Sequence, residues 1–180
     1  MKKLILLTAL CVSSYMMQAQ DFVRELDRKS DKVLLRGKIN FNDLLKESTF
    51  QWLEKGAADY KPNAQVIKGI KKYQDDYRLI IFGGTWCEDT RDLLPKLYKV
   101  LQVSGFDMNA IEMYGVNRDK QALNIEHQLY NIQKVPTIIL MHQYREIGRI
   151  IETVPSTIES ALLDIMEKDA PRIEKMKAGD

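Results

Sequence analysis

The chain has 180 residues, enough for one domain with a sizeable core. Its 45% hydrophobic and 29% charged residues exclude an intrinsically disordered chain. The formal net charge is +2, and Lys2 and Lys3 account for this excess. The charge therefore gives no reason to expect nucleic acid or an anionic membrane surface as a partner.

The N-terminal segment has the pattern of a signal peptide, which we predict for residues 1–19. Lys2 and Lys3 form a short basic start, residues 4–12 form an apolar run, and Ala19 is suited to precede the cleavage site. The apolar run is too short to cross a bilayer core, which needs roughly 20 apolar residues. A buried N-terminal strand or helix is the structural alternative.

Cys11 raises a third possibility for the same segment, a lipid-anchored cysteine. Leu10 precedes it, whereas such a processing site requires a small residue, so the lipid anchor at Cys11 is disfavoured. No later stretch is apolar and long enough for a membrane span. We expect an exported protein, in the periplasm.

Residues 20–76 are predicted to form a strand and helical extension that packs on the rest of the domain. Residues 32–39 have the composition of a strand, and Asn40 or Asn42 can cap a short helix after it. Two further helices are expected over about 49–57 and 64–74, separated by a proline. The segment that carries them is either a partner-binding surface or packing for the core, and we favour packing.

Residues 77–168 are predicted to form the core, and residues 169–180 a polar tail. The continuous apolar run 78–82 is typical of a strand buried on both faces. A helix is expected after Cys87, to about Ser104, followed by a strand over 109–116. The next helix is expected over 119–130, with Leu123, Ile125 and Leu129 inward, and strands over 138–142 and 146–151 follow it. A Ser156–Glu159 capping box is predicted to open a last helix that ends near Lys168. This order of elements predicts a mixed sheet with helices on both faces.

Cys87 is the only cysteine that remains if residues 1–19 are removed. In an oxidising compartment, an unpaired thiol is either deeply buried or reactive. Its place before a predicted helix favours the reactive form, because a helix N-terminus stabilises a thiolate. The alternative is that Cys87 and Trp86 are ordinary core residues.

Two motifs in this region resemble the thioredoxin family. The segment 79–97, LIIFGGTWCEDTRDLLPKL, resembles the active-site strand, turn and helix, with Pro95 where the family has its helix-kinking proline. The sequence VPT at 135–137, before an apolar strand, resembles the family's cis-proline loop. The resemblance covers about residues 78–168. It implies an α/β thioredoxin fold, with a mixed central sheet flanked by helices and an extra helical N-terminal segment.

The resemblance also implies the roles of individual residues. Cys87 is implied to be the catalytic nucleophile, and the substrate-binding residues are implied to be Trp86, Val135, Pro136 and Thr137. The chain departs from the family pattern at Thr90, which replaces the resolving cysteine, and at Ile81, which replaces a buried acid. A hydroxyl can position the Cys87 sulfur but cannot attack a mixed disulfide.

Glu88 and Asp89, in the first helical turn, modulate the thiol. They suit the helix dipole, yet they repel a neighbouring thiolate, and the two effects nearly cancel. The same two acids can equally be a solvated first turn with no further role.

The sequence thus predicts thiol–disulfide exchange by a monothiol mechanism, an activity like that of a thiol–disulfide oxidoreductase or isomerase. The expected partners are protein thiols and disulfides or a small-molecule thiol. A redox-inactive binding or chaperone module with the same fold is the main alternative, and peroxide sensing is a further one. We expect no cofactor and no metal, because His127 and His142 lack ligand spacing and Gly83-Gly84 lacks that of a phosphate loop.

Overall fold

The computed structural model describes residues 21–178, so the predicted signal peptide and Cys11 lie outside the described residues. The chain forms a mixed sheet with the strand order β1-β2-β4-β3-β5-β6. The strands are β1 (Phe22–Asp27), β2 (Lys32–Ile39), β3 (Arg78–Gly83), β4 (Ile111–Gly115), β5 (Thr137–His142) and β6 (Arg145–Ile151). The helices are α1 (Phe41–Leu45), α2 (Gln51–Asp59), α3 (Ala64–Tyr73), α4 (Glu88–Ser104), α5 (Glu126–Leu129) and α6 (Ile158–Ala178), with short 3-10 turns at Ser48–Phe50, Gln74–Asp76 and Met108–Ala110.

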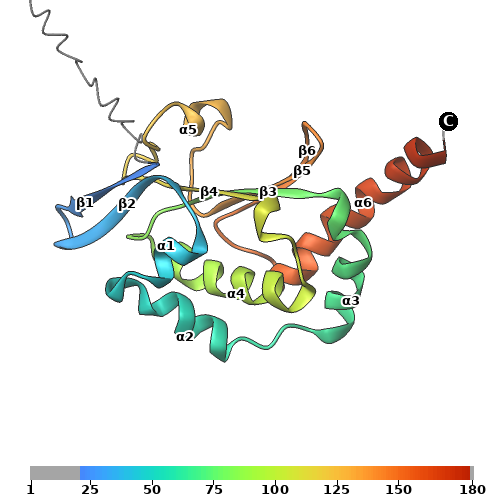
Figure 1. Cartoon of the computed structure of the whole chain (residues 1–180), viewed down its shortest axis with the longest axis horizontal. Helices are drawn as coiled ribbons and strands as arrows, with labels where there is room; N and C mark the ends of the chain where they lie inside the picture. The colour runs from blue at the N-terminus through green and yellow to red at the C-terminus, as the bar shows by residue number, and fades with distance from the viewer. Residues whose placement is uncertain (1–20, 179–180) are drawn as a thin grey trace, which may run out of the picture.

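The central strand β3 is buried on both faces, as its apolar sequence predicts. Leu79 and Ile81 pack into one hydrophobic core, and Ile80 and Phe82 pack into a second core on the opposite face. Helices α2, α3, α4 and α6 lie on the first side of the sheet, and the short α5 lies on the other (Figure 1). The first core is therefore the larger, and a single helical turn with its flanking loops covers the second.

The strand directions confirm the predicted fold class. β3 runs parallel to β4 through the crossover helix α4, whereas β5 is antiparallel to β3 and to β6. This β-α-β unit, followed by a hairpin and a final helix, is the thioredoxin fold. The helical N-terminal segment is also present, as α1, α2 and α3.

One strand of the sheet is not among the predicted elements. β1 pairs antiparallel with β2, in register from Phe22 opposite Gly37 to Asp27 opposite Lys32. Its sequence FVRELD mixes polar and apolar residues, and Leu26 on it is 63% exposed. An edge strand of this composition gives only a weak apolar signal, so a prediction from hydrophobic runs does not detect it.

The helix predicted over 119–130 is wrong for most of its length. The side-chain oxygen of Asn117 accepts hydrogen bonds from the backbone amides of Asp119 and Gln121, at 3.0 and 2.9 Å. Lys120 has a φ of 62°, in the left-handed region. These features form a turn in place of a helix, because a polar side chain has taken the amides that would begin it.

The inward orientation predicted for this segment is wrong for two of its residues. Ile125 is 57% exposed and Leu129 is 70% exposed. The second core is closed instead by Ala122, Ile132 and Val135, which are all buried.

Helix α6 begins and ends differently from the prediction. The hydroxyl of Thr157 accepts a hydrogen bond from the amide of Ser160 at 3.3 Å, so Thr157 caps the helix in place of Ser156. The helix also continues past the predicted end at Lys168 to the last described residue, where the sequence suggested a frayed tail.

Glu159 joins the N-terminal helical segment to α6. Its carboxylate is 1% exposed and accepts hydrogen bonds from the Tyr60 hydroxyl at 2.6 Å and the Asn63 amide at 3.0 Å. Burial raises the pKa of Glu159, but these hydrogen bonds outweigh it and hold the pKa below its ordinary value. The carboxylate therefore remains charged while it fixes the loop between α2 and α3.

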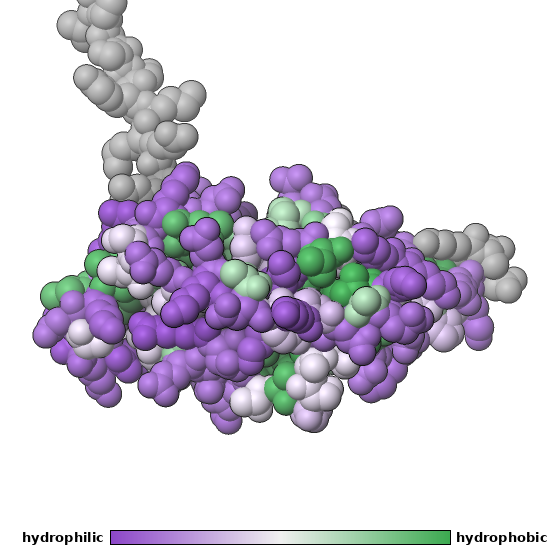
Figure 2. All heavy atoms as spheres, turned by 90° about the horizontal axis from the view of Figure 1, so that it is seen from below, coloured by the Kyte–Doolittle hydropathy of each residue, from purple (hydrophilic) through white to green (hydrophobic). Residues whose placement is uncertain are grey.

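The apolar residues of this N-terminal segment are used for packing. Leu53 and Ala57 on α2, and Ile67 and Ile70 on α3, are buried. Seen from below, the surface of the molecule is mostly hydrophilic, with small separate hydrophobic patches (Figure 2). Both helices thus turn their apolar faces toward the core.

Candidate functional site

Cys87 lies at the N-terminus of the long helix α4. It is the N-cap residue, with φ −86° and ψ 130°, and its backbone amide donates to the carbonyl of Gly84 at 2.8 Å. The thiol is half-buried and donates a hydrogen bond to the carbonyl oxygen of Val135 at 3.3 Å. The sulfur therefore bridges the start of α4 and the loop before β5, two segments far apart in the sequence.

The loop opposite the thiol contains a cis peptide bond between Val135 and Pro136. The Thr137 hydroxyl donates to the carbonyl of Lys134 at 2.7 Å, and the amide of Glu152 donates to the carbonyl of Pro136 at 2.8 Å. The side chains of Val135, Pro136 and Thr137 are buried. This loop can therefore meet a partner through its backbone rather than through these side chains.

Trp86 is fixed beside the thiol rather than free to move. Its indole N–H donates to the carbonyl of Val116 at 2.9 Å, and the ring is half-buried against the second core. A Cβ at Gly84 would lie 2.6 Å from the indole Cε2, so the ring needs a glycine beneath it. The indole can present only its remaining open part to a substrate.

The structure places Thr90 elsewhere than the predicted contact with the sulfur. Thr90 is 1% exposed, and its hydroxyl accepts a hydrogen bond from the amide of Gly84 at 3.3 Å. Its methyl group faces Gly83, where a Cβ would approach it to 3.1 Å. Thr90 thus supports the backbone of the turn that carries Cys87.

Glu88 and Asp89 are exposed in the first turn of α4, as their sequence position suggested. They match the positive end of the helix dipole. The Arg91 guanidinium donates to the carbonyl of Thr85 at 2.9 Å, which fixes the turn that carries Trp86 and Cys87.

An ion pair that the sequence analysis missed lies against Trp86. The guanidinium of Arg118 donates two hydrogen bonds, both 2.7 Å long, to the carboxylate of Asp27. The central carbon of the guanidinium lies 4.9 Å from the centroid of the Trp86 ring. Asp27 belongs to β1 and Arg118 to the turn after β4, so the pair could be predicted only from the contact between these two distant segments.

This ion pair makes stability depend on pH in a defined direction. The hydrogen bonds from Arg118 and then from Ser30 hold the pKa of Asp27 far below its ordinary value of 3.8. The carboxylate therefore contributes stability above pH 3.8, and this contribution is lost as the pH falls below that value. We expect the melting temperature of the wild type to fall more steeply between about pH 5 and pH 2 than that of Asp27→Asn. Parallel melting curves in the two proteins would contradict the assignment.

The histidines do not form a metal centre with other side chains. Across residues 21–178, no group of three or more His, Cys, Asp and Glu side chains is placed to hold a metal ion. The Nδ1 of His127 accepts a hydrogen bond from the Ala122 amide at 3.2 Å, and the buried His142 lies 3.3 Å from a carboxylate oxygen of Asp169.

None of the helices in the described part of the chain is long and apolar enough to span a membrane.

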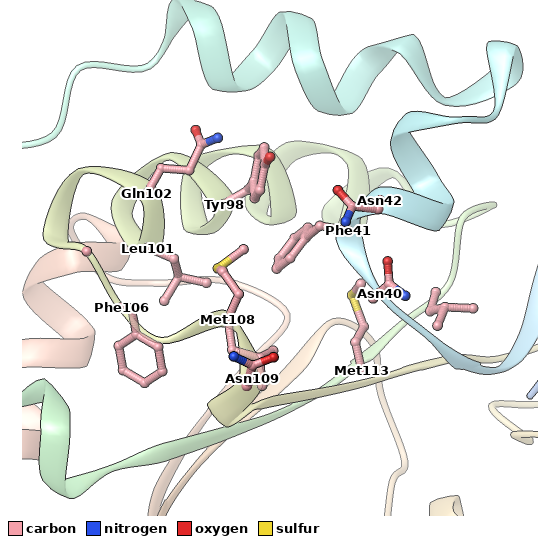
Figure 3. A pocket seen from close by; sticks show the side chains of 13 residues that line it. Asn40, Phe41, Asn42, Tyr98, Leu101, Gln102, Phe106, Met108, Asn109 and Met113 are labelled. Carbon is pink, nitrogen blue, oxygen red and sulfur yellow. The ribbon is translucent and has the colours of Figure 1, made fainter.

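Two hollows differ in their relation to Cys87. One of about 300 Å³ lies beside the thiol-bearing turn, between the first turns of α4 and the loop after β6, and its lining includes Asp89, Asp92 and Glu152. Another, of about 560 Å³, has walls from α1, α4 and the segment before β4 (Figure 3). Tyr98 in its wall is roughly 16 Å along α4 from Cys87, at about 1.5 Å per residue. The first hollow adjoins the start of α4, and neither hollow is lined by Cys87.

Comparison with known proteins supports the fold assignment and says nothing about an activity. No family model matches the chain, and no curated protein matches it in sequence. A protein of unknown function from Pseudomonas aeruginosa is similar with a TM-score of 0.52 and 15% identity, covering 73% of this chain and 93% of that chain. An HIV epitope scaffold has a TM-score of 0.51 and 14% identity, covering the same shares.

Thioredoxins are also among the similar solved structures. Mitochondrial thioredoxin 3 from Saccharomyces cerevisiae has 23% identity and a TM-score of 0.37, covering 53% of this chain and 81% of that chain. Its score is lower than those of the first two structures. At identities this low, the likeness to the first two solved structures shows the fold alone.

Proposed function

We propose that this protein exchanges thiols and disulfides by a monothiol mechanism, with Cys87 as the nucleophile. One observation carries the proposal. The Cys87 thiol is half-buried at the N-terminus of α4 and lies 3.3 Å from the carbonyl of Val135, beside the cis peptide bond. A helix of 17 residues stabilises negative charge at this end, which favours the reactive thiolate.

The proposed reaction has two balanced steps. The Cys87 thiolate attacks one sulfur of a substrate disulfide, forms a mixed disulfide with it, and expels the other sulfur as a thiolate, which takes up a proton. A second thiol then attacks the mixed disulfide as its thiolate and releases Cys87. If that thiol is a substrate thiol other than the one expelled, a different substrate disulfide forms and the outcome is isomerisation. If two external thiols are consumed, they become a disulfide and the substrate disulfide is reduced.

The surroundings of the thiol suit a peptide substrate. The backbone of the loop at Val135 and Pro136, which lies opposite the half-buried thiol, provides a place where an extended chain can pair. Among the described residues Cys87 is the only cysteine, so the thiol that releases Cys87 from the mixed disulfide must come from outside this part of the chain.

We further propose that the protein is exported and acts in the periplasm, because residues 1–19 have the pattern of a signal peptide.

A matched pair of peptides tests this function. A dansylated peptide joined through a disulfide to a small thiol is offered beside a peptide of the same length with a thioether in that place. We expect a covalent adduct at Cys87 only with the disulfide peptide, and loss of the adduct when external thiol is added. Mass spectrometry of intact protein and its Cys87 peptide measures both. If no adduct forms near neutral pH, the proposal fails.

The same experiment separates the rival function. A binding or chaperone module would hold both peptides with similar affinity and form no covalent adduct, because recognition would not involve the sulfur. Two features favour this rival: Thr90 stands in place of a resolving cysteine, and the fully buried Ile81 stands in place of an acid.

A further inference from the structure

We propose that Arg118 is a positioning residue that stabilises the Cys87 thiolate, and that Asp27 on β1 holds Arg118 in place for this task. The inference rests on the proposed function only in taking the Cys87 thiolate as the reacting group. It assigns a role to an ion pair built from β1 and from the turn after β4.

The ion pair is built as a rigid unit. Asp27 is 4% exposed, and both of its carboxylate oxygens accept hydrogen bonds from Arg118. The same carboxylate also accepts hydrogen bonds from the Ser30 hydroxyl and the Lys29 amide of the β1–β2 turn. A two-pronged contact of this kind fixes the plane of the guanidinium as well as its position.

The guanidinium is placed against the residue that precedes the thiol. It lies over the Trp86 ring with its central carbon 4.9 Å from the ring centroid, and the Trp86 indole is itself anchored on Val116. Stacking on an aromatic face leaves the edge of the guanidinium free for its ionic partner. The positive charge is therefore held at a fixed orientation against Trp86, the residue that precedes Cys87 in the sequence.

The guanidinium is electrostatically coupled to the sulfur. The pKa of Arg118 is raised first by Asp27 and also by the charge of Cys87. This attraction is mutual, so the guanidinium that is stabilised by the charged sulfur also favours the Cys87 thiolate.

The guanidinium opposes the other charges at the turn. Glu88 and Asp89 are acidic and exposed beside the sulfur, and they disfavour a thiolate there. Arg91 is the other basic group of the turn, and its guanidinium is bound to the carbonyl of Thr85. A unit charge at roughly 7 Å, with an effective dielectric of about 40–80, changes a thiolate population about three- to seven-fold.

The test uses variants whose expected effects have opposite signs. Arg118→Met removes the positive charge that is coupled to the sulfur, so the rate of iodoacetamide alkylation of Cys87 at pH 7 should fall about three- to seven-fold. Asp27→Asn keeps a side-chain oxygen that can accept a hydrogen bond from the guanidinium and hold it in place, but it removes the counter-charge, so the rate should rise above that of the wild type. Arg118→Lys keeps the charge and should restore most of the rate. The double variant Asp27→Asn with Arg118→Met should lie between the wild type and Arg118→Met.

A purely structural ion pair gives a different order. Every variant that breaks the pair would then move the rate in the same direction, and Asp27→Asn would not differ in sign from Arg118→Met. That result overturns the inference. Arg36→Met serves as a control, because it removes an arginine that pairs with Glu25 in the same hairpin and bonds to Ala122. If Arg118→Met does not fold, the double variant, which leaves no unpaired buried charge, is compared with Asp27→Asn, and the loss of Arg118 from that background should lower the alkylation rate.

The outcome is separable from that of the proposed function. Alkylation needs a thiolate but no disulfide exchange. If the alkylation order holds and no disulfide adduct forms, the exchange function fails and the role of Arg118 stands. If adducts form and the alkylation rates of the four variants coincide with the wild type, only the role of Arg118 is overturned.

Discussion

A Cys87→Ser variant is expected to form no mixed disulfide with a peptide disulfide under conditions in which the wild-type protein is fully converted. Serine has no sulfur to join the new bond, so the loss is complete rather than partial. Its hydroxyl can still donate to the carbonyl of Val135, which keeps the contact between α4 and the loop. The adduct is measured by intact mass after the reaction is quenched in acid.

The structural control for this variant is its melting curve and its affinity for the thioether peptide. Both should match the wild type within error, since the substituted side chain is half-buried and keeps its hydrogen bond. Residual adduct in Cys87→Ser would mean that the reacting group lies elsewhere in the chain, and the monothiol mechanism would be abandoned.

Gly115→Ala is expected to destabilise the protein by more than about 3 kcal/mol, or to prevent folding. A Cβ at this position would lie 2.2 Å from the carbonyl oxygen of Leu35, a backbone atom that cannot move without disturbing β2. β2 pairs with β4 at this point, where Gly37 is opposite Gly115. The side chain would therefore separate the β1–β2 hairpin from the rest of the sheet. Urea unfolding followed by circular dichroism measures the change.

Gly105→Ala is the matched control at the end of α4. Gly105 has a φ of 73° and no heavy atom within 4 Å of its Cβ position, so only the cost of the left-handed backbone remains. That cost is about 1–2 kcal/mol. Equal destabilisation of the two variants would show that the close approach of β2 and β4 is not the cause.

Local signals made several elements predictable from the sequence. The strand β2 agrees with its expected bounds, and α3 and α4 agree to within a residue, because each helix has a strong terminal signal. Asn63 caps α3 through its side chain, and Gly105 ends α4 in the left-handed conformation. Signals of this kind involve residues close together in the chain.

The remaining features depend on contacts between distant residues. Asp27 and Arg118 are each unremarkable in sequence, and only the pairing of β1 with β2 brings the carboxylate to the guanidinium. Likewise, the capping-box spacing at Ser156 and Glu159 was misleading, because Glu159 bonds to Tyr60 in a loop that precedes the core. Thr90 is a further example at the site. Its place in the sequence suggested that it positions the Cys87 sulfur, whereas in the structure its hydroxyl accepts a hydrogen bond from the amide of Gly84.

The hydrogen bond from the Cys87 thiol to the carbonyl of Val135 links the charge of the sulfur to the accessibility of the loop. A thiolate has no proton to donate, so ionisation removes this bond and leaves the carbonyl oxygen without its donor. The event that makes the sulfur a nucleophile thus also frees a backbone acceptor for the amide of an arriving chain. When the thiol is protonated, the thiol and the carbonyl are hydrogen-bonded to each other, and the carbonyl is less available to a peptide.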